Sequence, residues 1–137
     1  MQHNEIEKNL VAENKIILDE FRMALNTKQL SEKTIKSNID NIDFFAEYLK
    51  YYEPLEGLST SSAYDVNDFL GEWFPRKAMW ASPSNVRSYI SSFKKFFNWM
   101  VNEQKLPLEE YADLLSLIKE EKEAWLAASS YEEGCYF

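Results

Sequence analysis

SPSNVRSYISSFKKFFNWM, residues 82–100, is the stretch that carries the clearest structural signal in this chain. Its apolar residues follow offsets of 0, 3, 4, 7, 10, 11 and 14 from Val86, which is the period of one helix face. Ser82 is a good N-cap, and Pro83 suits the first helical position. The stretch therefore predicts an amphipathic helix with these inward side chains: Val86, Tyr89, Ile90, Phe93, Phe96, Phe97 and Met100.

Upstream of this helix, the spacing of apolar residues predicts three more helices. The first covers about residues 4–26. The second begins at the N-cap Ser31 and stops before Pro54. The third is short; it follows a capping box that starts at Ser62, and Pro75 ends it or at least disrupts it. Their inward faces are expected to hold Ile6, Leu10, Ile17, Phe21 and Leu25 in the first, Ile35, Ile39, Ile42, Phe45 and Leu49 in the second, and Val66, Phe69, Leu70, Trp73 and Phe74 in the third.

Downstream, a fifth helix is predicted to start near Pro107. Only three Gly and four Pro occur in 137 residues, which favours long helices with short connections over a turn-rich β fold. The sequence therefore predicts an all-α protein with a single domain over residues 1–128 and a tail at 129–137. The inward face of the fifth helix is expected to hold Tyr111, Leu114, Leu115, Ile118 and Trp125.

The composition excludes several classes of protein. Hydrophobic residues make up 45% of the chain, so a packed core is expected rather than disorder. The one cysteine, Cys135, rules out an internal disulfide. Its thiol is interpreted as buried or incidental and not as a nucleophile, because the one histidine, His3, lies at the other end of the sequence and cannot activate it. No metal-ligand spacing or Gly-rich phosphate loop appears, so no metal or cofactor is expected. No apolar run approaches the roughly 18 residues of a membrane span, and no signal-peptide pattern opens the chain, so we expect no membrane association and a cytoplasmic location.

The net charge is unevenly distributed along the sequence. The whole chain carries −8, from 15 basic and 23 acidic residues, which by itself argues against binding to nucleic acid. Residues 82–106 nevertheless carry four basic groups against one acidic group, a net charge of +3, whereas residues 107–137 carry two against eight, a net charge of −6. The helix at 82–100 is therefore the one positive element of the chain.

The polar face of this helix combines cations with small hydrogen-bonding side chains. At about 100° per residue, Arg87, Ser91, Lys94 and Asn98 fall in one narrow stripe opposite the apolar face, and Ser84 and Lys95 flank it. Such a mixture suits contacts to phosphates and base edges. Arg76 and Lys77 lie just upstream and would extend it. The same stripe is also what the solvated face of an ordinary surface helix shows, so charge alone leaves both interpretations open.

The order of the helical motifs resembles a known domain. LSEKTI at residues 30–35, followed by Phe45 and Tyr48-Leu49, resembles one opening segment of the core-binding, SAM-like domain of phage integrases, the tyrosine recombinases. DVNDFL at residues 65–70 resembles a second segment of that domain, and residues 82–100 resemble a third. The resemblance covers roughly residues 15–120, with the motifs in the family's order.

This resemblance implies a compact orthogonal bundle of four to five helices that contacts one face of double-stranded DNA. The helix similar to residues 82–100 approaches the major groove in that family, and the start of the helix similar to residues 31–50 contacts the backbone. Capping of a helix is the alternative role for Thr34 and Ser84. Carried over by position, with Lys33 added as a neighbour, the candidate DNA-binding residues are Lys33, Thr34, Lys36, Ser84, Asn85, Arg87, Ser91, Lys94 and Lys95.

The chain departs from the family at several points. Asn85 stands where the family usually has Thr, and Arg87-Ser88 stands where it usually has Asn-Arg. No set of arginines and histidines surrounds a tyrosine, and Tyr131 and Tyr136 lack the cations that a phosphoryl-transfer nucleophile needs. We therefore expect no catalytic activity.

Two functions remain open on the sequence. The first is a non-catalytic DNA-binding module in the context of DNA integration or recombination. The second is a protein-interaction module that keeps the recombinase-like fold and contacts a recombinase or another protein. Its contact surface would be the acidic C-terminal helix, or Trp80 and Trp99. The acidic helix can also serve only solubility, or shield the basic stripe.

Overall fold

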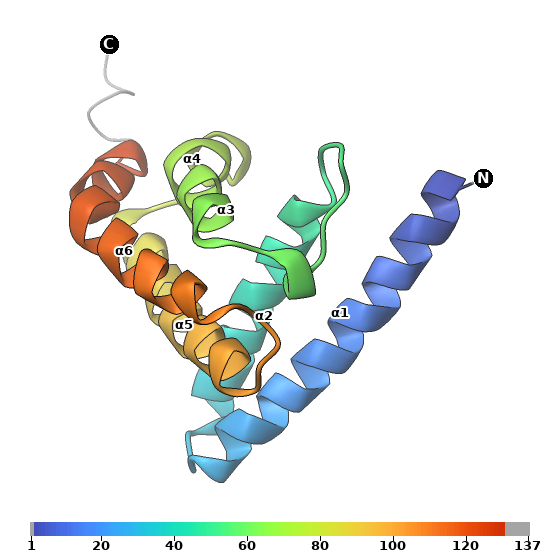
Figure 1. Cartoon of the computed structure of the whole chain (residues 1–137). Coiled ribbons are helices and arrows are strands. Elements are labelled where there is room, and N and C mark those ends of the chain that lie inside the picture. The colour runs from blue at the N-terminus through green and yellow to red at the C-terminus, as the bar shows by residue number, and fades with distance from the viewer. Residues whose placement is uncertain (1, 131–137) are drawn as a thin grey trace. The chain divides into compact units, whose positions relative to one another are not determined.

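The computed structural model describes residues 2–130, and every regular element within this range is helical (Figure 1). The predicted all-α class is confirmed for these residues. They fall into two compact units, one within Met1–Ser61 and the other within Ser62–Phe137, here called the N-terminal and C-terminal units. The single domain over residues 1–128 stays a prediction. The interpretations of Cys135, Tyr131 and Tyr136 concern positions outside the described residues.

The N-terminal unit is built on a pair of helices. Helix α1 (Gln2–Thr27) packs beside α2 (Glu32–Leu49), and a 3₁₀ turn, η1 (Leu58–Thr60), packs on α1. Ser31 caps α2 by accepting a hydrogen bond from the Thr34 amide at 3.1 Å, as predicted. The predicted inward residues of α2 are all buried, and Ala46 joins them.

The inward face of α1 is only partly as predicted. Ile17, Phe21 and Leu25 are buried, but Leu10 is half-buried and Ile6 is 50% exposed. Helix α1 has 26 residues and α2 has 18, so their lengths are about 39 and 27 Å. Because the two helices are joined at the C-terminal end of α1, its first turns extend past α2 and lose their packing partner.

A buried asparagine fastens η1 to α1. The Leu58 amide donates to Asn14 Oδ1 at 2.9 Å, and Asn14 is only 5% exposed. A Cβ at Gly57 would lie 2.8 Å from Leu10 Cδ2, so the backbone approaches α1 closely at this glycine. The connection after α2 is therefore held against α1 by a polar contact that hydrophobic spacing does not predict.

Replacing Asn14 with alanine is expected to lower the free energy of unfolding by about 1–3 kcal/mol, because the buried Leu58 amide loses its acceptor. Urea unfolding followed by circular dichroism measures this change. The control is Glu13→Ala, which removes an exposed hydrogen bond to Ser59 on the same segment and should change stability by less than about 0.5 kcal/mol. Equal effects of the two substitutions would contradict the role given to Asn14.

The C-terminal unit begins with three consecutive helical segments. Helix α3 (Ala63–Asp68) follows the predicted capping box, in which Ser62 Oγ accepts from the Asp65 amide and an Asp65 carboxylate oxygen accepts from the Ser62 amide. A π-helical segment, η2 (Phe69–Trp73), and α4 (Phe74–Lys77) continue it without a break.

Pro75 disrupts this helix but does not end it. The helix runs on to Lys77, and the disruption is the π-helical segment, in which the Phe74 amide donates to the Phe69 carbonyl five residues back. A proline in a regular α-helix clashes with the carbonyl four residues earlier and lacks an amide to bond it. The wider π turn just before Pro75 relieves that conflict.

Helices α5 (Pro83–Asn102) and α6 (Leu108–Ala128) pack against each other in the same unit (Figure 1). The inward face predicted for α5 is buried throughout, and Phe69 of η2 makes ring contacts with Tyr89 and Phe93. On α6 the prediction was wrong for Leu115, which is 39% exposed, and Tyr111 is only half-buried, whereas Leu114, Ile118 and Trp125 are buried. Neither α6 nor any other helix within residues 2–130 combines the length and the apolar character needed to cross a membrane.

Candidate nucleic-acid interface

The polar stripe predicted on α5 lies at the surface of the C-terminal unit. Arg87, Ser91 and Lys94 are exposed, and Asn98 is half-buried at the end of the stripe. Helix α5 contains no acidic residue between Pro83 and Asn102, so no carboxylate of its own offsets these charges. The opposite face is buried, which holds the stripe outward.

Arg87 and Lys94 have no ion-pair partner among the residues that the structure describes. Lys95 differs, because it is half-buried and its Nζ donates to Ser91 Oγ at 2.8 Å, one turn back along the helix. Two cations about two turns apart are therefore available to an anionic partner, with a serine hydroxyl between them.

The N-terminus of α5 is closed by a reciprocal pair of hydrogen bonds. The Asn85 amide donates to Ser82 Oγ at 3.2 Å, and the Ser82 hydroxyl donates to Asn85 Oδ1 at 2.8 Å. Asn85 therefore supports the cap of α5. Ser84, for which capping was the alternative role, is exposed and does not cap the helix.

The remaining three candidates lie at the start of α2, in the N-terminal unit. Lys36 Nζ is 2.7 Å from Asp40 Oδ2, so the Asp40 carboxylate, one helical turn away, largely neutralises the charge of Lys36. Thr34 Oγ1 accepts from the Ser31 hydroxyl at 2.9 Å, which gives it the capping role. Lys33 is exposed. These three residues form a weaker anion site than the stripe on α5.

The acidic helix α6 does not cover the basic stripe. It packs on α5 within one unit, yet Arg87 and Lys94 stay exposed, and no ion pair in the described part of the chain joins the two helices. One α6 carboxylate has a structural role, because Glu110 Oε1 accepts from the Ala63 amide at the start of α3 at 2.8 Å. Four other carboxylates are exposed along α6: Glu109, Asp113, Glu120 and Glu123.

The tryptophans considered for protein contact are not equivalent. Trp80 is 55% exposed in the connection before α5, next to Met79, which is 94% exposed. Trp99 is only half-buried rather than exposed, and its ring lies 6.0 Å from that of Phe96. Upstream, Arg76 is exposed but pairs with Glu72 at 3.5 Å.

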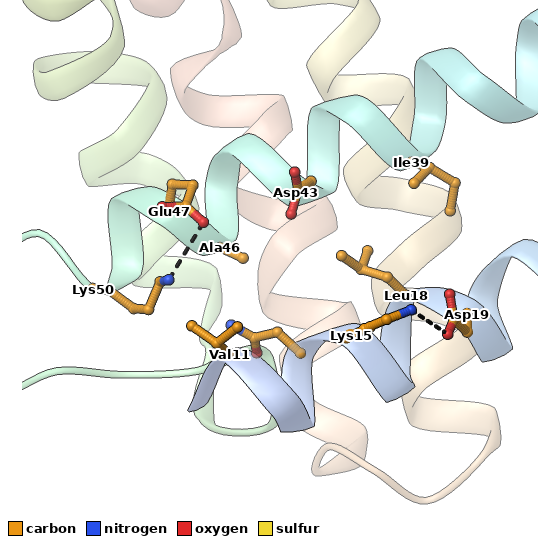
Figure 2. Close-up of a pocket in the computed structure, with 10 residues that line it drawn as sticks. Val11, Lys15, Leu18, Asp19, Ile39, Asp43, Ala46, Glu47 and Lys50 are labelled. Atoms are coloured by element: carbon orange, nitrogen blue, oxygen red, sulfur yellow. Dashed lines mark hydrogen bonds and ion pairs between the residues drawn. The ribbon is translucent and has the colours of Figure 1, made fainter. Parts of the chain in front are cut away.

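Sequence reasoning missed a groove between α1 and α2 in the N-terminal unit (Figure 2). Asp43 lines it, and partial burial together with the nearby carboxylates of Glu47 and Asp40 raises the pKa of Asp43, while Lys50 acts in the opposite direction. The sequence does contain a signal for this acidic cluster: Asp40, Asp43 and Glu47 are spaced three and four residues apart, so they lie on one face of the helix.

Within residues 2–130, no three or more His, Cys, Asp or Glu side chains are grouped to hold a metal ion. Neither a protein-family model, nor a curated protein, nor a solved structure matches the chain. The likeness to the recombinase core-binding domains therefore rests on sequence motifs alone.

Proposed function

We propose that this chain is a non-catalytic DNA-binding module whose helices are arranged as in the SAM-like core-binding domain of a tyrosine recombinase. Its main contact with double-stranded DNA is the polar stripe of α5, through Arg87, Ser91 and Lys94. Lys33 and Lys36 at the start of α2 are secondary contacts. The setting is DNA integration or recombination, as the motif order suggests.

One observation carries this proposal. Helix α5 has a fully buried aromatic face and an opposite face with two exposed, unpaired cations and no acidic residue, in a chain whose net charge is −8. Cations that an acidic protein leaves unpaired on a rigid helix are well suited to anchoring phosphates, while the serine between them can donate to phosphate or base. The helix fits the major groove in width.

The affinity should be modest and strongly dependent on salt. The acidic body repels the duplex, and α5 offsets this repulsion with only two cations that are exposed and unpaired within residues 2–130, Arg87 and Lys94. Two phosphate contacts predict a slope of about −1.8 in log affinity against log salt, so raising salt from about 50 to about 200 mM should weaken binding about 12-fold.

Fluorescence anisotropy with a labelled duplex of about 30 base pairs, titrated at these two salt concentrations, measures this dependence. The expected result is saturable binding at about 50 mM salt, with an affinity that falls at about 200 mM salt as the slope predicts. A folded protein that leaves the anisotropy unchanged at low salt would contradict the proposal. A salt-independent affinity would contradict the stripe as the contact.

A protein-interaction module is the second candidate, and the exposed carboxylates of α6 are the observation that favours it. These four carboxylates have no ion-pair partner within residues 2–130: Glu109, Asp113, Glu120 and Glu123. They are therefore available to pair with the cations of a basic protein surface. Failure of the DNA titration with a folded protein would leave this candidate as the better one.

A further inference from the structure

The groove between α1 and α2 has an apolar floor and a charged rim. Its volume is about 310 Å³, which reaches the lower end of ligand-sized pockets. Leu18, Ile39 and Ala46 form the floor and are buried, with exposures of 9%, 7% and 1%. Val11 forms one edge and is 46% exposed. The floor is therefore a packed surface, and the edge leaves apolar area open to an occupant.

The charges on the rim are paired with one exception. Lys15 pairs with Asp19 at 3.2 Å on α1, and Lys50 pairs with Glu47 at 3.3 Å on α2. Figure 2 shows Asp43 between these two ion pairs, with no partner drawn to it. No ion pair within residues 2–130 includes Asp43, so this carboxylate lies beside the apolar floor with no direct ion-pair partner, although Lys50 is near enough to lower its pKa in part.

Without an occupant in the groove, the surroundings of Asp43 disfavour its ionised, carboxylate form. Its pKa is raised by partial burial first and then by the neighbouring Glu47 and Asp40, which means that the ionised form is destabilised at this position. A cation that enters the groove would offset the repulsion from Glu47 and Asp40 by direct attraction to the Asp43 carboxylate. An occupant with positive charge and an apolar stem would satisfy both the rim and the floor.

We propose that this groove is a docking site for an arginine side chain carried by an extended segment of a partner protein. The guanidinium group would donate to the Asp43 carboxylate, and its stem would lie on Leu18, Ile39 and Ala46. Arginine suits the site better than lysine because its planar head is weakly hydrated and donates two parallel hydrogen bonds to one carboxylate.

The shape of α1 argues for a chain segment rather than a free small cation. A second hollow of about 400 Å³, lined by Asn4, Glu7, Lys8 and Val11, adjoins the groove and shares Val11 with it. The two hollows follow one face of α1 from Asn4 to Leu18, a distance of about 21 Å at 1.5 Å per residue. About six residues of an extended chain cover that distance. This site lies in the N-terminal unit and is independent of the DNA-binding proposal for α5.

The test is an NMR titration of the isotopically labelled full chain with an acetylated and amidated hexapeptide, Ala-Leu-Arg-Ala-Leu-Ala, up to about 10 mM, a concentration that detects weak binding. The amides of residues 14–19 and 43–50 should shift saturably. The same peptide with citrulline, the neutral isostere of arginine, should bind at least about fivefold more weakly, as expected for loss of a charge-assisted hydrogen bond at a partly exposed site.

The variant Asp43→Asn should reduce the affinity for the arginine peptide by a similar factor. Its matched control is Glu103→Gln, which removes the same charge from an exposed site at the end of α5 and should leave the affinity unchanged. Equal binding of the arginine and citrulline peptides, or groove amides that do not move, would overturn the proposal. If Asp43→Asn does not fold, the comparison of the two peptides on the wild type decides alone.

Discussion

The double substitution Arg87→Glu and Lys94→Glu is expected to weaken DNA binding at least about 100-fold at about 50 mM salt. Each exposed cation that donates to a phosphate contributes about 1.5 kcal/mol, close to a factor of ten, and both contacts are lost together. Each new carboxylate also repels the phosphate that the cation contacted. The magnitude of the slope of log affinity against log salt should fall from about 1.8 to near zero, because both exposed cations of the α5 stripe are removed.

The matched control for this experiment lies on α6. Lys119→Glu with Lys122→Glu also changes the net charge from −8 to −12, since 13 basic and 25 acidic residues result, but it does so at exposed positions on α6 and leaves the α5 stripe intact. Anisotropy titrations of both double variants should separate a local effect from a global one. Equal loss of binding in the two would show that only net charge matters and would refute α5 as the contact. Both variants should keep the wild-type stability within about 0.5 kcal/mol per substitution.

The helices were predictable because their signals are local. Ser31, Ser62 and Ser82 cap helices in the structure as the sequence predicts, and the 3.6-residue period of α5 gives its whole buried face. The stripe on α5 follows from the same period, since residues opposite a buried face must face outward. Exposure of Arg87, Ser91 and Lys94 is the part of the candidate site that sequence alone predicts correctly.

Helix ends were harder to predict because glycine does not mark them. Gln29 and Gln104 adopt left-handed backbone conformations, with φ of 61° and 59°, just after α1 and α5. After α5 the Lys105 amide donates to the Met100 carbonyl and the Gln104 amide to the Val101 carbonyl, which is a Schellman ending. Glycine is the usual residue at such a position, so the sequence rules do not locate these ends.

The remaining misses depend on contacts between elements distant in sequence. Asn14 accepts from Leu58 across 44 positions, and no periodicity marks a buried asparagine. The groove at Asp43 is formed jointly by α1 and α2, so neither helix predicts it by itself. Thr34 and Asn85 are a different case, because their side-chain oxygens accept from serines only three positions away at helix caps. Residue type alone does not separate capping from a DNA contact, and their assignment to DNA stays a prediction.

Replacing Trp125 with alanine is expected to destabilise the protein by about 3–5 kcal/mol, the largest effect of any single substitution considered for this chain. Trp125 is 1% exposed, and its Nε1 donates to Asn67 Oδ1 on α3 at 2.9 Å. Its ring also packs on the π-helical segment, where a Cβ at Gly71 would lie 3.3 Å from Trp125 Cδ1. Alanine at position 125 would leave a large cavity between α6 and the α3–η2 segment, and it would also deprive Asn67 Oδ1 of its hydrogen-bond donor.

Two further variants separate these contributions. Trp125→Phe keeps most of the buried ring but loses the hydrogen bond to Asn67, so it should cost about 1–3 kcal/mol. Leu108→Ala on the same helix is 75% exposed and should cost less than about 0.5 kcal/mol. Thermal unfolding followed by circular dichroism should place the midpoint of Trp125→Ala more than about 10 °C below the wild type. Because α5 packs on α6, we also expect the Trp125→Ala protein to bind DNA more weakly at temperatures near its unfolding midpoint. At temperatures well below that midpoint it should bind DNA as the wild type does. Because Trp125 is buried, a loss of binding by a fully folded Trp125→Ala protein would contradict this expectation.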